Sequence, residues 1–119
     1  MSTVRGIDAT YYTTADLERG IRFYSELLGM EPTVTMPGFV AEWTFADNTT
    51  FGLHHAAGYD GGQRGSVMFS VADVEAVMRE AIARGVRFDD EDITDTPVCR
   101  MAFGRDPDDN QFILHQHKG

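Results

Sequence analysis

The sequence has 119 residues, and a hydrophobic share of 42% is enough to bury one core, which excludes a disordered chain. Ten basic and nineteen acidic side chains give a formal net charge of −9, which excludes a nucleic acid as the expected partner because its phosphates would be repelled. The single cysteine, Cys99, allows no intrachain disulfide, and we expect it to be a buried strand residue. Since no apolar run resembles a signal peptide or a membrane span, we expect a soluble, cytoplasmic protein with no membrane partner.

The first half of the chain begins with a β-rich run at residues 8–13 and continues into an amphipathic helix at residues 15–29. Asp16 is placed to cap the start of this helix, and Gly29 can adopt the left-handed conformation that ends one. The apolar side chains of the helix recur every three or four residues and are Leu17, Ile21, Tyr24 and Leu28. Further β-rich runs follow at residues 33–36, 39–45 and 49–55.

A glycine-rich segment at residues 57–65 is typical of a linker, and the second half then repeats the order of the first. A β-rich run at residues 66–71 precedes a helix at residues 72–85, which opens on Asp73, 57 residues after Asp16. The β-rich runs after this helix are at residues 86–88, 98–103 and 111–117. The pattern predicts an α+β fold of two βαβββ modules, 1–56 and 66–119, which share a core within one chain or across a dimer.

Two motifs accompany this repeat. The first is the helix pattern D-x-x-R-x-x-x-F-Y-x-x-x-L-G at residues 16–29, and the second is the turn D-P-D-x-N at residues 106–110. Together with the repeat they resemble the vicinal oxygen chelate superfamily, which includes glyoxalase I, extradiol dioxygenases, and fosfomycin- and bleomycin-resistance proteins. The resemblance covers nearly the whole chain. It implies a single domain, residues 1–119, whose modules form a cupped mixed sheet paired across a homodimer, with the ligand inside the cup.

The resemblance also implies four strand positions at which metal-dependent members carry a His, Gln or Glu ligand. Two of these positions, Ala9 and Ser66, are counted from the helix-opening aspartates, and Ile113 is counted from the D-P-D turn. The fourth, Gly52, is found by matching the strands of the two halves. Alanine, glycine and isoleucine offer no side-chain ligand atom, and a neutral serine hydroxyl is a weak ligand. We therefore expect no metal and no cofactor, and a relocated metal site at His54 and His115 is the alternative.

The other side chains of the cup follow from strand alternation, which places every second residue on the same face. The predicted face is rich in aromatic, methionine and small residues, a surface suited to planar rings, and Phe39 and Tyr59 are expected to close its rim. The face taken by Trp43 and Phe45 depends on a hairpin register that the sequence does not fix, and Glu42 is expected to point away. The expected ligand-binding residues are Tyr11, Phe39, Trp43, Phe45, His54, Tyr59, Ser66, Met68, Met101, Phe103 and His115.

No residue is expected to be catalytic. The chain has no G-x-S-x-G motif, Ser66 and Ser70 have no evident Ser-His-acid partners, and Cys99 is expected to face away from the cup. The resemblance, together with the missing ligand atoms, favours a metal-independent protein that sequesters an antibiotic similar to bleomycin, mitomycin or the enediynes and so confers resistance. Its partner would be an aromatic small molecule, either cationic or neutral.

Two alternatives to sequestration remain open. The first is an enzyme of the same superfamily, a glyoxalase-like lyase or isomerase or a dioxygenase, which uses a relocated metal or a histidine base such as His54 or His115. The second is a dimeric structural or regulatory module with a collapsed cup, which would bind no small molecule.

Overall fold

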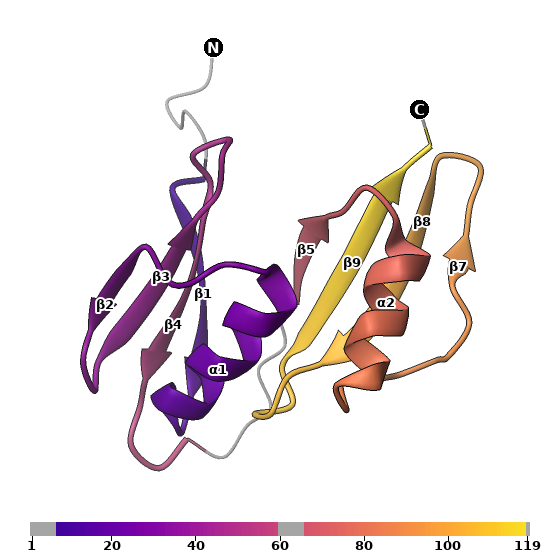
Figure 1. Ribbon diagram of the computed structural model, residues 1–119. Coiled ribbons are helices and arrows are strands. Elements are labelled where there is room, and N and C mark those ends of the chain that lie inside the picture. Colours follow the sequence, from indigo (N-terminus) through magenta and orange to yellow (C-terminus); the bar gives the residue numbers. More distant parts are fainter. Residues whose placement is uncertain (1–6, 60–65, 119) are drawn as a thin grey trace. The chain divides into compact units, whose positions relative to one another are not determined.

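The computed structural model describes residues 7–59 and 66–118 and divides the chain into two compact units, residues 1–61 and 62–119. The boundary falls inside the predicted linker at residues 57–65, of which residues 60–65 lie outside the described residues. In each unit a helix packs against one face of a mixed sheet (Figure 1). The α+β fold predicted from the sequence is therefore confirmed. The first unit has the predicted βαβββ order, and the second has the same order with one additional short strand, β7.

The first unit forms a four-stranded sheet in the order β1-β4-β3-β2. β1 pairs with β4 in parallel, whereas β3 pairs antiparallel with both of its neighbours. The elements of this unit are β1 (Ala9–Thr14), α1 (Leu17–Leu28), β2 (Val34–Met36), β3 (Val40–Thr44) and β4 (Thr50–His55).

The second unit forms a sheet in the order β5-β9-β8-β6, with β7 paired to the same central strand, β8. β5 pairs with β9 in parallel, as β1 does with β4. In the described part of the chain, neither helix has the length and apolar character needed to cross a membrane. The elements of this unit are β5 (Ser66–Ser70), α2 (Val74–Ala83), β6 (Arg87–Phe88), β7 (Thr94–Asp95), β8 (Cys99–Arg105) and β9 (Gln111–His117).

Both helices begin with the aspartate cap that the sequence predicts. Asp16 Oδ1 accepts a hydrogen bond from the backbone N–H of Arg19 at 3.1 Å, and Asp73 Oδ1 accepts one from that of Ala76 at 3.1 Å. Each carboxylate thus satisfies one of the N–H groups that lack a partner at the start of a helix. Gly29 ends α1 with φ at 70°, the left-handed conformation that glycine adopts without strain.

The internal repeat extends to the strand register. Phe51 and Leu53 of β4 occupy the same places beside β1 that Phe112 and Leu114 of β9 occupy beside β5, at a spacing of 61 residues. All four side chains are buried and form the seam against which the helices pack. The corresponding strand residues of the two halves can therefore be found by adding 61 to a position in β3 or β4.

The core of the first unit is aromatic. Tyr24 of α1 is fully buried, with its ring centroid 4.7 Å from that of Phe51 and 6.1 Å from that of Trp43. Trp43 lies opposite Phe51 in the ladder, and its indole N–H donates a hydrogen bond to the Met30 carbonyl at 3.1 Å. The prediction that Trp43 faces the cup is therefore wrong, because its indole is part of the core beneath α1. Phe45 follows with the same strand parity, so the register does not place it with the predicted ligand-binding residues either.

In the second unit a glycine stands where the first unit has Trp43. Gly104 lies opposite Phe112, as Trp43 lies opposite Phe51. A Cβ atom at position 104 would lie 2.8 Å from Cε2 and 2.9 Å from Cε1 of Phe112, so the ring fills the space above the glycine. Phe88 packs edge-on against Phe112 with 5.8 Å between the ring centroids and fixes the ring in place.

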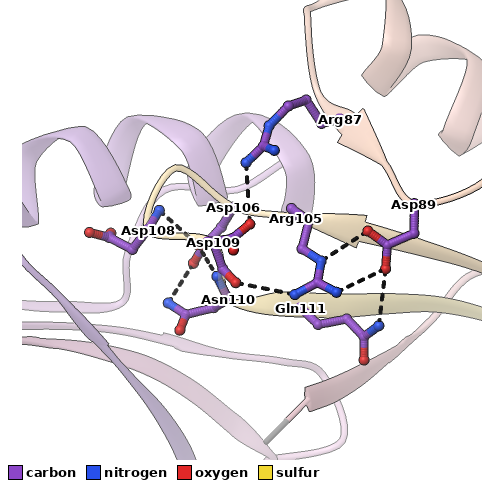
Figure 2. Close-up of polar contacts among 8 residues, drawn as sticks. All are labelled: Arg87, Asp89, Arg105, Asp106, Asp108, Asp109, Asn110 and Gln111. Atoms are coloured by element: carbon purple, nitrogen blue, oxygen red, sulfur yellow. Dashed lines mark hydrogen bonds and ion pairs between the residues drawn. The ribbon is translucent and has the colours of Figure 1, made fainter. Parts of the chain in front are cut away.

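The D-P-D-x-N motif forms the turn between β8 and β9 (Figure 2). The buried carboxylate of Asp106 accepts hydrogen bonds from the backbone N–H groups of Asp108 at 2.9 Å and Asn110 at 2.8 Å, and from the Asn110 side-chain amide at 2.9 Å. Asp109 adopts a positive φ of 66°, a conformation that aspartate tolerates in turns. This motif therefore acts as a structural device that closes the hairpin.

An ion pair lies beside this turn (Figure 2). Arg105 donates from Nε at 2.9 Å and from Nη2 at 3.1 Å to the two carboxylate oxygens of Asp89, and Gln111 Nε2 donates to the same carboxylate at 3.3 Å. The hydrogen bonds from Arg105, assisted by Gln111 and by the charges of Arg105 and Arg87, hold the pKa of Asp89 below its ordinary value. The pair connects β8 to the segment that follows β6.

The substitution Gly104→Ala should destabilise the protein by about 1–3 kcal/mol, because the new methyl group would overlap a buried ring that is held by its neighbours. Urea unfolding measures the change. In a Phe112→Leu background the same substitution should cost less than about 1 kcal/mol, since the ring is no longer there. Equal costs in both backgrounds would contradict the packing of Phe112 over Gly104.

The ion pair should stabilise the fold in a defined range of pH. Because the folded-state pKa of Asp89 lies below its unfolded value, the contribution is present above about pH 4 and is lost as the pH falls through the folded-state pKa. Arg105→Gln should cost at most about 1 kcal/mol near neutral pH, since the two side chains are 32% and 38% exposed. Urea unfolding of both proteins should show this difference shrink in acid, and a difference that is independent of pH would refute the assignment.

Candidate functional site

The candidate site is the face of the first sheet that carries no helix, termed here the helix-free face. The register places Tyr11, Gly52 and Glu42 side by side on one rung across β1, β4 and β3. The next rung on the same face consists of Thr13, His54 and Val40. Strand alternation keeps this face separate from the core residues Tyr12, Trp43, Phe51 and Leu53 on the other side.

The Tyr11 ring covers Gly52. A Cβ atom at position 52 would lie 2.5 Å from Cε2 and 2.8 Å from Cδ2 of Tyr11, so only a residue without a side chain fits beneath the ring. Gly52 is buried as a result, while Tyr11 itself stays 38% exposed. The centre of this face is therefore occupied by an exposed aromatic surface, which is the kind of surface on which planar ligands stack.

His54 lies next to this ring. The Tyr11 and His54 ring centroids are 6.3 Å apart at an interplanar angle of 63°, and His54 Nε2 is 3.3 Å from the hydroxyl of Thr13. Because one imidazole nitrogen is held by the threonine, the ring has a defined orientation beside the aromatic surface. His54 is exposed and can donate or accept a hydrogen bond to a bound molecule.

Glu42 also lies on this face, which corrects the prediction that it points away. The register pairs Glu42 with Gly52, whereas its neighbour Trp43 is buried on the helix side. The sequence did contain the signal for this orientation. Glu42 precedes Phe103 by 61 residues, the same spacing that relates Gly52 to Ile113, so the internal repeat gives Glu42 the face on which Phe103 was expected.

The helix-free face of the second sheet has equivalent rungs. Phe103 lies opposite Ile113, and Met101 lies opposite His115. Met68 of β5 pairs with Ile113 from the other side and is 50% exposed. The predicted ligand-binding residues that the register gathers on this face are Ser66, Met68, Met101, Phe103 and His115.

Cys99 is buried, as predicted, but the prediction that it faces away from this surface is wrong. The register pairs Cys99 with His117 at the end of the same face. Its sulfur atom lies 3.2 Å from the Thr96 hydroxyl, so the loop before β8 covers it. The His117 ring packs edge-on against His115 with 4.7 Å between the centroids.

The two predicted rim residues lie outside the strands. Phe39 is 61% exposed in the turn between β2 and β3, and its carbonyl accepts a hydrogen bond from the N–H of His55 at 2.8 Å, so it lies beside the end of β4. Tyr59 lies beyond β4 in a turn where its N–H donates to the Ala56 carbonyl at 3.2 Å. Strand register therefore gives neither ring a place on the helix-free face, and their role at a rim stays a prediction.

The residues at the four implied metal-ligand positions do not fit a divalent metal. Gly52 lies beneath the Tyr11 ring, and the other three positions are Ala9, Ser66 and Ile113, of which only the serine has a ligand atom. Within residues 7–59 and 66–118, no group of three or more His, Cys, Asp or Glu side chains is arranged to hold a metal ion. The relocated histidine pair of the alternative is divided between the two units and stays a prediction.

Comparison with known proteins points to one family. The family model described as Glyoxalase/Bleomycin resistance protein/Dioxygenase superfamily matches residues 6–114. A search of curated proteins found no match.

Solved structures share the fold over nearly the whole chain. An Agrobacterium tumefaciens protein determined by NMR is 22% identical, with a TM-score of 0.78 and coverage of 98% of this chain and 100% of that one. A lactoylglutathione lyase from the same organism is 18% identical, with a TM-score of 0.77 and coverage of 97% and 96%. A glyoxalase/bleomycin resistance protein from Catenulispora acidiphila is 21% identical, with a TM-score of 0.74 and coverage of 93% and 98%.

The substitution Gly52→Ala should displace the Tyr11 ring from the sheet. The ring is partly exposed and can rotate away, so we expect a loss of stability of only about 1 kcal/mol or less. NOEs between the Tyr11 ring and the Hα atoms of Gly52 should be strong in the wild-type protein. In the variant, NOEs from the ring to the Hα atom of the substituted residue should be weak or absent, and an unmoved ring would refute the close contact.

Proposed function

Because the chain belongs to the glyoxalase/bleomycin resistance protein/dioxygenase superfamily, we propose that it binds and sequesters an aromatic antibiotic, similar to bleomycin, mitomycin or an enediyne, without catalysis. The observation that carries the proposal is the Tyr11 ring above Gly52. At a strand position where the family resemblance implies a metal ligand, this chain has an exposed aromatic surface and no room for any side chain. Such a surface favours stacking of a planar group.

The second sheet supports the same proposal. Its helix-free face carries Phe103, Met101 and the half-exposed Met68. Methionine side chains adapt to irregular apolar shapes, and an aromatic ring among them adds a flat contact surface. Burial of roughly 200 Å² of apolar ligand surface at about 25 cal/mol per Å² would supply on the order of 5 kcal/mol before the costs of association.

Sequestration requires no chemical step. Tyr11 and His54 would anchor polar groups of the bound drug, and a tightly bound drug would no longer reach its target. We further propose that the protein acts as a homodimer, since a unit of about 60 residues is too small to bury most of its own surface. We also propose that it acts in the cytoplasm. Resistance would then depend on the amount of protein, because each bound drug molecule occupies one binding site.

An enzyme of the same superfamily is the second candidate. The observation that favours it is the presence of Glu42 and His54 on one face, because a carboxylate and an imidazole are the groups most often used in general acid–base catalysis. A ligand bound on the Tyr11 ring would lie near both the carboxylate and the imidazole. This candidate uses a histidine or carboxylate base and needs no metal.

A thermal-shift screen with bleomycin, mitomycin C and an enediyne tests the proposal. A ligand at about 100 times its Kd should raise Tm by roughly 5–10 °C, because it binds only the folded protein. Tyr11→Ala should abolish the shift, whereas Ile82→Ala, which removes an exposed apolar side chain from α2, should leave it unchanged. Trp43 is a poor reporter for this purpose, since it is buried on the opposite side of the sheet.

Recovery of the ligand separates the two candidates. If mass spectrometry finds the drug unchanged after long incubation, sequestration is supported. Conversion of the drug that is lost in both Glu42→Gln and His54→Ala would support the enzyme. Failure of every compound in the panel to shift Tm would count against antibiotic sequestration.

A further inference from the structure

One rung of the first sheet combines an aromatic ring with a carboxylate. The register runs from Tyr11 on β1 through Gly52 on β4 to Glu42 on β3, all on the helix-free face. The Tyr11 ring extends over Gly52, with Cζ 3.1 Å from the place of a Cβ atom there, so the ring leans across β4 in the direction of β3. The ring therefore extends over β4 on the same face of the sheet that carries Glu42 of β3.

Among the described strand residues of this surface, Glu42 is the one acidic residue. The residues that the register places on the described helix-free face of the first sheet are Ala9, Tyr11, Thr13, Val34, Met36, Val40, Glu42, Thr44, Thr50, Gly52 and His54. Among these residues Glu42 is the only one with a carboxylate side chain. No ion pair joins the Glu42 carboxylate to another described residue, and the side chain is half-buried.

We infer that this rung selects a planar aromatic cation, with Tyr11 as the stacking platform and Glu42 as the residue that determines charge specificity. The inference rests on the proposed function and specifies its ligand. A cation above the tyrosine face gains a cation–π interaction and, at the same time, the attraction of the adjacent carboxylate. A neutral ring would remove water from the carboxylate without supplying an opposite charge, and an anion would be repelled. The net charge of −9 acts in the same direction at longer range.

Two probes of the same shape isolate the effect of charge. 10-Methylacridinium is a permanent cation, and acridine is its neutral counterpart at about pH 8. Fluorescence titration should show that the wild-type protein binds the cation about tenfold or more tightly than the neutral ring. The affinity for the cation should fall as NaCl is raised from about 50 mM to about 500 mM, while the affinity for acridine should not.

Substitutions assign the charge preference to one residue. Glu42→Gln should weaken binding of the cation by about five- to tenfold and leave acridine binding unchanged or slightly stronger. Glu91→Gln removes an equal charge from an exposed position in the other unit and should change neither affinity by more than about twofold. Tyr11→Ala should weaken the binding of both probes, because it removes the stacking surface.

The outcomes distinguish this inference from the proposed function. If the wild-type protein binds both probes equally, or if Glu42→Gln keeps full affinity for the cation, the assignment of Glu42 is overturned while Tyr11-dependent binding leaves the proposed function standing. If neither probe binds but an antibiotic of the panel does, the inference that the ligand is a planar cation is overturned and the proposed function stands. If nothing binds, both fail. Should Glu42→Gln fold poorly by circular dichroism, the salt dependence of the wild-type protein decides the question.

Discussion

Each sheet of this protein packs a helix on one face, and strand alternation then assigns every strand side chain either to the core or to the helix-free face. In the first unit the core face takes Tyr24, Trp43 and Phe51, whose rings pack against one another. The opposite face is left with Tyr11, Gly52 and Glu42. A shift of one residue in the register of β3 would exchange Trp43 and Glu42, replacing a buried indole with a buried carboxylate, so the composition of the surface is fixed by the cost of burying a charge.

Much of the fold can be predicted from the sequence, because the signals are local. Aspartate caps and a terminal glycine mark the helices, and the turn residues Asp106 and Asn110 mark the last hairpin. The face of Trp43 could not be read from its own neighbourhood, since a hairpin register is set by pairing between strands. The spacing of 61 residues between the halves contained that information, because it equates Trp43 with Gly104 and Glu42 with Phe103. The position of the Tyr11 ring over Gly52 has no comparable signal, since it depends on how a side chain leans across a neighbouring strand.

The two sequence motifs that indicate the family are structural in this chain. Asp16 caps a helix, and Asp106 organises the turn between β8 and β9 through three hydrogen bonds. Neither motif therefore supplies the candidate site of this chain, which consists of strand residues of the helix-free faces. Here those residues include the aromatic rings of Tyr11 and Phe103, thioethers, histidines, the carboxylate of Glu42 and, at one end of the second sheet, two arginines. The positions implied for metal ligands hold alanine, glycine, serine and isoleucine. The aromatic rings and thioethers are the groups on which the proposal of ring binding rests.

Intermolecular NOEs from a bound ligand would test most directly whether the Tyr11 surface is the binding site. With 10-methylacridinium in complex with the isotopically labelled protein, we expect contacts from the ligand ring to the Tyr11 ring and to the β-protons of Glu42, and none to the side chain of Tyr24, which is buried beneath the other face. Contacts that involve only α1, or only residues remote from Tyr11 and Glu42, would contradict the account.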